Sequence, residues 1–202
     1  QNAERAKAQA AFADYGQYLD SLAMTAAIKG FEPLYIQRIA QLTNKSNQFN
    51  LTTLRCSEDD IRAMAGDKND LCLCGKLVDK FGDNGIVTVV AGRQQGDVLD
   101  LTLWLMSCRV LKRGMEDAMM DTLVAEAAAR GVKTIVGHYY PTAKNAMVRE
   151  FYAQFGFTKV AEDADGNTVQ PTDEETAAAK EAAKETADKI LAAYKSGTSL
   201  ES

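Results

Sequence analysis

A run of apolar residues that leads into a basic, glycine-containing turn places the strongest constraint on how this chain folds. Residues 98–119 read VLDLTLWLMSCRVLKRGMEDAM. The first part of this run predicts a β-strand, in which successive side chains point to opposite faces. The leucines at every second position from Leu99 to Leu105 then form a plain core face. The opposite face carries Asp100, Thr102, Trp104, Met106 and Cys108.

The turn that follows this strand runs from Arg109 to Gly114 and is rich in basic residues. The acidic residues Glu116 and Asp117 come next, where they suit the positive end of a helix dipole. A strand, a turn and a helix start in this order form an arrangement that favours phosphate binding. We therefore expect an anion site at this turn.

The spacing of apolar residues predicts helices and further strands on both sides of the turn. The expected helices cover residues 2–28, 32–42, 58–65, 113–130 and 141–155. The expected strands, besides the one that begins at Val98, cover residues 49–55, 71–79, 86–91 and 134–140. A short hairpin over residues 158–170 and an alanine-rich helix over residues 173–195 complete the pattern.

The connections between these elements predict a mixed sheet. Short turns join the strands 71–79, 86–91 and the one from Val98, so these three should be antiparallel neighbours. A helix separates the Val98 strand from the strand 134–140, so these two should be parallel. The expected class is α/β, with a mixed central sheet flanked by helices. The expected domain division is a helical segment over residues 1–42, a domain over residues 43–170 and a helical tail over residues 171–202.

Composition excludes several classes of function. A net charge of -5 and a pI near 5.0 argue against a nucleic-acid-binding surface. No apolar run approaches the roughly 20 residues that cross a bilayer, and no signal peptide is visible, so we expect a cytoplasmic protein that does not bind membranes. The cysteines form no zinc-type pair and the sequence has one histidine, so no metal site is expected. The cysteines are Cys56, Cys72, Cys74 and Cys108.

The order of these elements and several motifs resemble the GNAT acyltransferase superfamily. The segment from Arg109 to Gly114 is similar to the family's phosphate loop, Arg/Gln-x-x-Gly-x-Gly/Ala, with Lys112 in place of the first glycine. Asn145 and the run Phe151-Tyr152-x-x-x-Gly156-Phe157 match the last helix of the family. The resemblance implies a GNAT-like acyltransferase fold, with N-terminal helices and a C-terminal helical tail added to it. It also implies binding of coenzyme A or a phosphopantetheine arm.

A narrower resemblance is to the C-terminal domain of FkbH-like proteins. It rests on four segments in order: residues 44–53 (NKSNQFNLTT), 81–87 (FGDNGIV), 107–114 (SCRVLKRG) and 140–145 (YPTAKN). In that family a domain of the haloacid dehalogenase (HAD) superfamily precedes this one. Together they load a glyceryl unit from 1,3-bisphosphoglycerate onto an acyl carrier protein for polyketide extender units. The sequence lacks the Asp-x-Asp-x-Thr motif of the HAD-like domain, so the resemblance implies that this chain is the second domain, with the upstream domain as a partner.

The resemblance implies a site where the Val98 and Thr134 strands part and a pantetheine arm lies between them. Cys108 ends one strand and His138 lies near the end of the other, so a Cys-His pair is expected to hold an acyl thioester. The position of Cys108 before a helix and beside Arg109 favours the thiolate. Alternatively, Cys108 is a small buried residue and His138 is merely hydrogen-bonded.

The remaining candidate residues divide into three groups. Tyr152 is expected to protonate the leaving thiolate, although it also fits the core stripe of its helix. The expected cofactor-binding residues are Arg109, Lys112, Arg113, Gly114 and Asn145, with Lys144 beside them, and the alternative for the basic ones is a solvated turn. The expected substrate-binding residues are the amides Asn47, Gln48 and Asn50, which alternatively bond to their own loop.

Three functions follow from this resemblance. The first is an acyltransferase that moves a glyceryl group through a cysteine thioester to the phosphopantetheine thiol of an acyl carrier protein. The second is an acetyl-CoA-dependent N-acetyltransferase, which needs no nucleophilic cysteine. The third is a non-catalytic module that only docks a carrier protein, which Lys112 in the phosphate loop favours.

Overall fold

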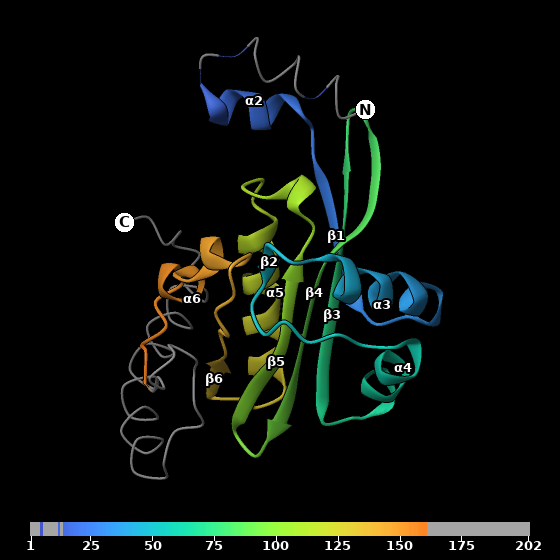
Figure 1. Ribbon diagram of the computed structural model, residues 1–202, viewed down its shortest axis with the longest axis vertical. Coiled ribbons are helices and arrows are strands. Elements are labelled where there is room, and N and C mark those ends of the chain that lie inside the picture. The colour runs from blue at the N-terminus through green and yellow to red at the C-terminus, as the bar shows by residue number, and fades with distance from the viewer. Residues whose placement is uncertain (1–4, 6–11, 13, 161–202) are drawn as a thin grey trace.

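A mixed six-stranded sheet forms the centre of the molecule (Figure 1). The computed structural model describes Arg5, Phe12 and residues 14–160. In chain order the strands are β1 (Thr25–Gly30), β2 (Phe49–Asn50), β3 (Asp70–Asp79), β4 (Gly82–Gln95), β5 (Val98–Met106) and β6 (Thr134–Gly137). The spatial order is β1-β3-β4-β5-β2, and β6 also pairs with β5. Strands β3, β4 and β5 are antiparallel neighbours and β6 is parallel to β5, so the predicted α/β class and mixed sheet are confirmed.

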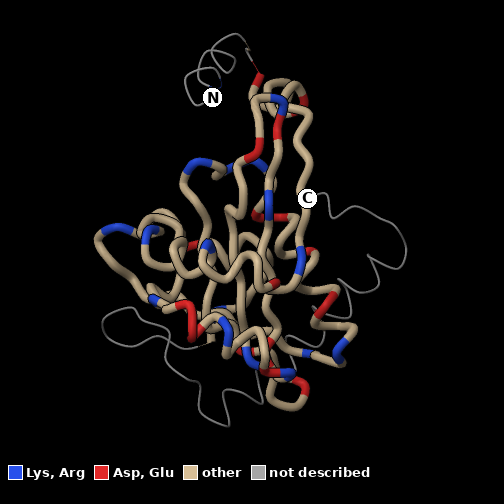
Figure 2. Tube along the Cα trace, turned by 90° about the vertical axis from the view of Figure 1, so that its right-hand side faces the viewer, with Lys and Arg blue, Asp and Glu red and all other residues tan. Residues whose placement is uncertain are grey.

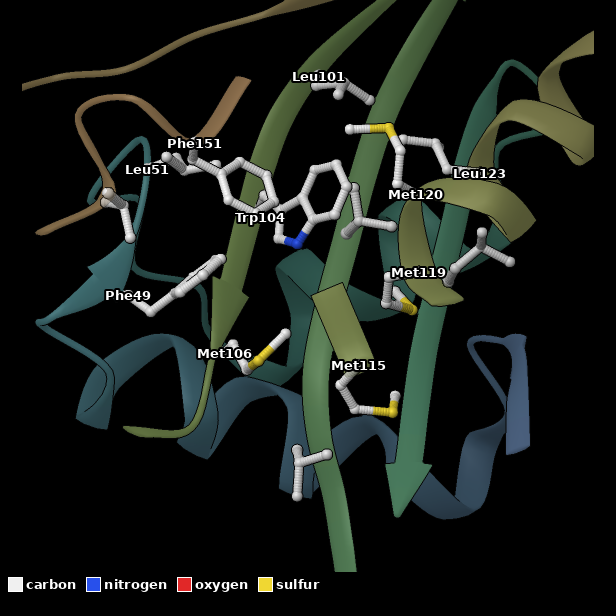
Figure 3. Packing of buried hydrophobic residues seen from close by; sticks show 14 of the residues in the cluster. Phe49, Leu51, Leu101, Trp104, Met106, Met115, Met119, Met120, Leu123 and Phe151 are labelled. Atoms are coloured by element: carbon white, nitrogen blue, oxygen red, sulfur yellow. The ribbon is translucent and has the colours of Figure 1, made fainter. Parts of the chain in front are cut away.

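Helices cover both faces of this sheet. In chain order the helices are α2 (Tyr15–Ser21), η1 (Pro33–Tyr35), α3 (Ile36–Lys45), α4 (Glu58–Gly66), η2 (Cys108–Val110), α5 (Met115–Ala129), η3 (Ala146–Val148) and α6 (Phe151–Gln154). Helix α2 lies beyond the end of the sheet (Figure 1). One core lies between the sheet and α5, η3 and α6, where methionines of α5 pack beside Trp104 and Met106 (Figure 3). The second core lies between the opposite face and α3 and α4. No helix in the described part of the chain has the length and apolar character that a bilayer crossing requires.

A β-bulge in β5 changes the predicted faces of that strand. Leu101 pairs with Gly92 and Leu103 pairs with Ala91, so Thr102 is an extra residue that faces no partner. Because one extra residue shifts the alternation, Leu101 lies in the same core as Trp104, and Leu103 lies in the other core. The predicted all-leucine face is therefore wrong beyond Leu101.

Three predicted elements are also wrong. The helix predicted over residues 2–28 is not continuous, because α2 ends at Ser21 and residues 25–30 form β1, which pairs with β3. The strand predicted over residues 49–55 is limited to Phe49–Asn50. The helix predicted over residues 141–155 is replaced by turns, η3 and α6. Backbone pairing and the side chain of Asn145, described below, override the local pattern in these segments.

Other local predictions are confirmed. Helix α4 begins at a capping box between Ser57 and Asp60 and ends at Gly66, close to its predicted limits. Strand β1 and most of helix α3 come before residue 43, yet β1 pairs with β3 and α3 packs in the core with α4. The hairpin predicted over residues 158–170 lies outside the described residues except for 158–160, which form no strand, and the predicted tail helix lies wholly outside them.

Candidate functional site

A cleft of about 850 Å³ opens between the C-terminal end of α3, the loop that follows it, and η2. Helix α3 ends at Lys45, and Ser46 continues in extended conformation, so the loop turns toward the end of β5. There Met106 ends the strand and η2 begins at Cys108. Residues 143–144 form part of the rim. The cleft therefore lies where the basic turn leaves the sheet.

Cys108 lies in this cleft and is exposed, in contrast to the three other cysteines. Burial raises the pKa of Cys56 and of Cys74 to about 11 and that of Cys72 to about 12. These three thiols therefore stay protonated near neutral pH. The alternative that Cys108 is a small buried residue is wrong.

Four cations line the same cleft, namely Arg38, Lys45, Arg109 and Lys144. None of them makes an ion pair within the described residues, and no carboxylate lines the cleft. Burial, followed by the positive charge of Arg109, lowers the pKa of Arg38. Basic and acidic residues are otherwise interspersed along the trace (Figure 2). Unpaired like charges of this kind favour an anionic ligand.

Sequence reasoning missed two of these cations. Arg38 and Lys45 lie on α3 seven residues apart, so they share one face of that helix. This spacing was visible in the sequence, but a lone basic pair on a helix does not distinguish a binding face from a solvated one. Of the predicted substrate amides, Asn47 and Gln48 do line the cleft.

Asn50 and Asn145 have structural hydrogen bonds in place of the predicted ligand contacts. Both are fully buried. Asn145 Nδ2 donates to the carbonyl oxygens of Asn50 and Tyr140 at 3.0 and 2.9 Å, and its Oδ1 accepts from the Thr142 N–H at 2.7 Å. Asn50 Nδ2 donates to the Ser46 carbonyl at 3.3 Å, and its Oδ1 accepts a main-chain N–H. Asn145 also precedes η3, so it does not share one helix with the predicted catalytic tyrosine.

His138 is not brought to Cys108. Its Nε2 lies 2.5 Å from Asp100 Oδ1, and the ring is buried outside the cleft lining. Asp100 is near the start of β5 and Cys108 follows its end. At the usual rise per residue, about 20 Å separates Asp100 from Met106 at the other end of the strand. The expected Cys-His pair is therefore not formed.

Tyr152 lies beside the His138–Asp100 pair. Its ring packs against Gly137, where an added Cβ would come within 2.4 Å of the ring. It also contacts Trp104 with a centroid separation of 6.2 Å. The hydroxyl is buried, and burial raises its pKa. The main chain of His138 lowers this pKa by a smaller amount, and the charge of Asp100 raises it further. Tyr152 thus packs in the core, away from the Cys108 cleft.

The opening between β5 and β6 is filled by the chain itself. The two strands pair as far as Leu101 and Gly137 and then part, as expected. Strand β2 takes the free edge of β5 beyond this point, and the Leu51 N–H donates to the Trp104 carbonyl at 2.9 Å. On its other side the Leu51 carbonyl accepts the Tyr140 N–H at 2.8 Å. The slot expected to hold a pantetheine arm is therefore occupied by main chain.

The basic turn is also held by the protein's own groups. Lys112 has a left-handed backbone with φ of 58°, and its N–H donates to Glu116 Oε1 at 2.8 Å. The Arg113 guanidinium contacts the Asp79 carboxylate at 3.3 Å. Gly114 precedes α5 with φ of 76°. Arg109 is the member of the predicted phosphate loop that lines the cleft.

No protein-family model matches this chain, and no curated protein matches it. Solved structures do match. The ribosomal-protein-S18-alanine N-acetyltransferase from Escherichia coli is 15% identical, with a TM-score of 0.51 over 74% of this chain and 97% of that one. Rv2747 from Mycobacterium tuberculosis, solved in complex with CoA and NLQ, is 15% identical, with a TM-score of 0.52 over 80% and 88%. The PaiA N-acetyltransferase from Thermoplasma acidophilum, in complex with coenzyme A, is 13% identical, with a TM-score of 0.50 over 71% and 96%. The chain is thus similar to GNAT N-acetyltransferases in fold.

Proposed function

We propose that this chain is an acyltransferase domain in which Cys108 carries an acyl group as a thioester. The observation that carries the proposal is an exposed thiol in a cleft lined by four cations that have no carboxylate partner among the described residues. An acyl donor with an anionic leaving group fits this lining. A cationic amine acceptor does not fit it, because every charged side chain in the lining is positive and none can act as its base.

Two substitutions at the acyl carbon make up the reaction. The Cys108 thiolate attacks the carbonyl carbon of the donor, the S–C bond forms, and the leaving group departs with its electron pair. An acceptor thiolate then attacks the thioester carbon and releases the Cys108 thiolate. No oxidation or reduction occurs, and the exchange between two thioesters costs little free energy.

The proposed substrates are a phosphorylated acyl donor and a carrier-protein thiol. The donor is 1,3-bisphosphoglycerate, the leaving group is phosphate, and the acceptor is the phosphopantetheine thiol of an acyl carrier protein, with a HAD-like domain upstream. The four FkbH-like segments support this form. In it Arg38 and Arg109 bind the leaving phosphate, and the Asn47 and Gln48 amides bind the glyceryl hydroxyls.

His138, Tyr152 and Asn145 have other roles in this proposal. His138 and Tyr152 stabilise the seam between β5 and β6, and Asn145 joins the β2 segment to the loop after β6. Their variants are expected to lower stability more than they lower the acylation of Cys108.

A second candidate is an acetyl-CoA-dependent N-acetyltransferase. The likeness in fold to two N-acetyltransferases, one of them solved with coenzyme A, favours it. This activity transfers the acetyl group directly to an amine and leaves no acyl group on Cys108.

Intact-protein mass spectrometry separates these candidates. The chain is incubated with 1,3-bisphosphoglycerate and, separately, with acetyl-CoA, and the acylated peptide is mapped. A glyceryl adduct on Cys108 that is absent in Cys108→Ala and moves to a carrier protein supports the first function. The three buried cysteines serve as internal controls. Acetylation of an amine that persists in Cys108→Ala supports the second. Carrier binding with no adduct would show a docking module instead.

A further inference from the structure

We infer that Arg55 is a positioning residue that fixes the Asn47 amide so that its N–H groups, and not its oxygen, are available to the cleft. The inference rests on the Cys108 cleft of the proposed function, and it adds what that cleft selects. Arg55 does not line the cleft, so it acts through the loop behind it.

The Arg55 guanidinium joins three acceptors around the end of α3. Nη1 donates to the carbonyl oxygens of Thr43 and Ser46, the second at 2.9 Å. Nη2 donates to Asn47 Oδ1 at 2.5 Å. Carbonyl groups at a helix C-terminus lack partners within the helix and carry a partial negative charge, so a guanidinium satisfies them well. Arg55 thereby ties the loop to the helix.

This contact fixes which way the Asn47 amide faces. An amide has one acceptor oxygen and one NH₂ group with two donors. Turning the amide over would set its NH₂ group against the Arg55 guanidinium, donor against donor. Because Asn47 lines the cleft and its oxygen is held by Arg55, the group left for a ligand is Nδ2.

The cleft consequently selects for acceptors. Its charged side chains are all cations, Asn47 adds a donor, and no carboxylate lines it. The favoured ligand group presents lone pairs, as a carboxylate or phosphate does. Lysine at position 55 would keep the positive charge, but it lacks the planar guanidinium that reaches three acceptors. We therefore expect that lysine cannot hold the Asn47 amide as arginine does.

Alkylation of Cys108 tests this selectivity for hydrogen-bond acceptors and needs no acyl-transfer activity. Iodoacetate carries a carboxylate and iodoacetamide is neutral, yet both react in the same way, with the S–C bond forming as iodide leaves. The measured quantity is the ratio of the two alkylation rates at Cys108, followed by peptide mass spectrometry. We expect Arg55→Lys to lower this ratio by about threefold, which corresponds to the net free energy of one hydrogen bond. Asn47→Ala should lower it to the same extent.

The double variant decides whether Arg55 acts through Asn47. Adding Arg55→Lys to Asn47→Ala should change the ratio no further. The matched control is Arg62→Lys, an exposed arginine that pairs with Glu58 and Asp59 on α4 and should leave the ratio unchanged. An unchanged ratio in Arg55→Lys, or an equal further fall in the double variant, would overturn the inference. Because alkylation needs no acyl donor, absence of a glyceryl adduct would refute the proposed function and leave this result standing.

Discussion

Solvent exposure divides the cysteines of this chain into two chemical kinds. Cys108 is exposed at the start of η2, and the other three are buried in the core beneath α3 and α4. Thiolate is the reactive form, and burial without a charged partner disfavours it. The proposed acylation therefore has a selectivity that simple reagents can measure.

We predict that a maleimide labels Cys108 alone in the folded protein at about pH 8. The pKa values of Cys56 and Cys74, raised to about 11, and of Cys72, raised to about 12, keep these thiols protonated there. Their labelling should begin only as the pH approaches those values or the protein unfolds. Peptide mapping after labelling checks this, with a sample in urea as the control. Early labelling of Cys72 would contradict it.

A second prediction at this scale concerns Asn145. Replacing it with alanine removes its hydrogen bonds to Asn50, Tyr140 and Thr142 and leaves buried groups unpaired. Asn145→Ala should lower the free energy of unfolding by about 2–3 kcal/mol. The control is Asn84→Ala, because the Asn84 contacts are 3.5 Å long. Urea unfolding measures both, and equal losses would contradict the structural role given to Asn145.

The same asparagines show what residue identity predicts and what it does not. The sequence singled out Cys108, Arg109, Asn47 and Gln48, and all four line the cleft. It grouped Asn50 with Asn47, although Asn50 is buried and bonded to its own loop. An amide serves a ligand and a main chain equally well, so its role depends on which long-range partner folding brings to it. The neighbouring sequence does not distinguish an asparagine that lines the cleft from one that bonds to the main chain.

At the scale of elements, the sequence predicted correctly those features that depend on neighbouring residues alone. Helix α4, predicted over residues 58–65, begins at Glu58 after a capping box formed by Ser57 and Asp60. The bulge at Thr102 is different, because it depends on the register between β4 and β5 and has no marker in the sequence of β5 itself. Strand β1 depends likewise on its pairing with β3.

The turn before α5 gives a prediction at this scale. The Glu116 carboxylate takes the Lys112 N–H, so a phosphate at this turn would meet a like charge. Glu116→Gln keeps the hydrogen-bond acceptor and removes the charge. It should tighten the binding of inorganic pyrophosphate about two- to fivefold, the usual size of a charge effect at a helix end.

Calorimetric titration of the wild-type chain and the Glu116→Gln variant measures this affinity. The control is Asp117→Asn, which removes the same charge from the neighbouring exposed position and should have a smaller effect. A larger gain in Asp117→Asn would mean that the general charge of the helix start, and not Glu116, limits binding.

At the scale of the molecule, distant segments complete the site and close the sheet. The β2 segment lies between α3 and α4 in the sequence. It joins the edge of β5 to the loop after β6. This insertion closes the expected pantetheine slot, and it cannot be read from the sequence because each contact spans about fifty residues or more. The sequence predicted the sheet and its connections, since these follow from short turns and one crossover helix.

Asp79 makes another long-range connection. It is buried at the end of β3, where its carboxylate accepts from Arg5 Nε at 2.7 Å and Nη2 at 2.8 Å and contacts Arg113 at 3.3 Å. Burial alone would raise the pKa of Asp79, but the hydrogen bonds from Arg5 and from the Phe81 N–H, with the charge of Arg5, outweigh burial and lower it. The ionised carboxylate thus joins Arg5 to Arg113 in the turn before α5.

A pH-dependent loss of stability follows from this arrangement. Because the pKa of Asp79 is lower in the folded state than in the unfolded state, its contribution is present above the ordinary carboxyl pKa and is lost as the pH falls through the folded value. Asp79→Asn should cost about 3 kcal/mol at neutral pH, since it removes the buried charge that Arg5 and Arg113 both contact. The difference in the free energy of unfolding between wild type and variant should narrow as the pH falls below about 4.

Urea unfolding at several pH values measures this difference. The control is Asp83→Asn, which changes an exposed carboxylate paired with Lys76. A difference that stays constant down to acid pH would mean that Asp79 stabilises the fold by packing and not by its charge.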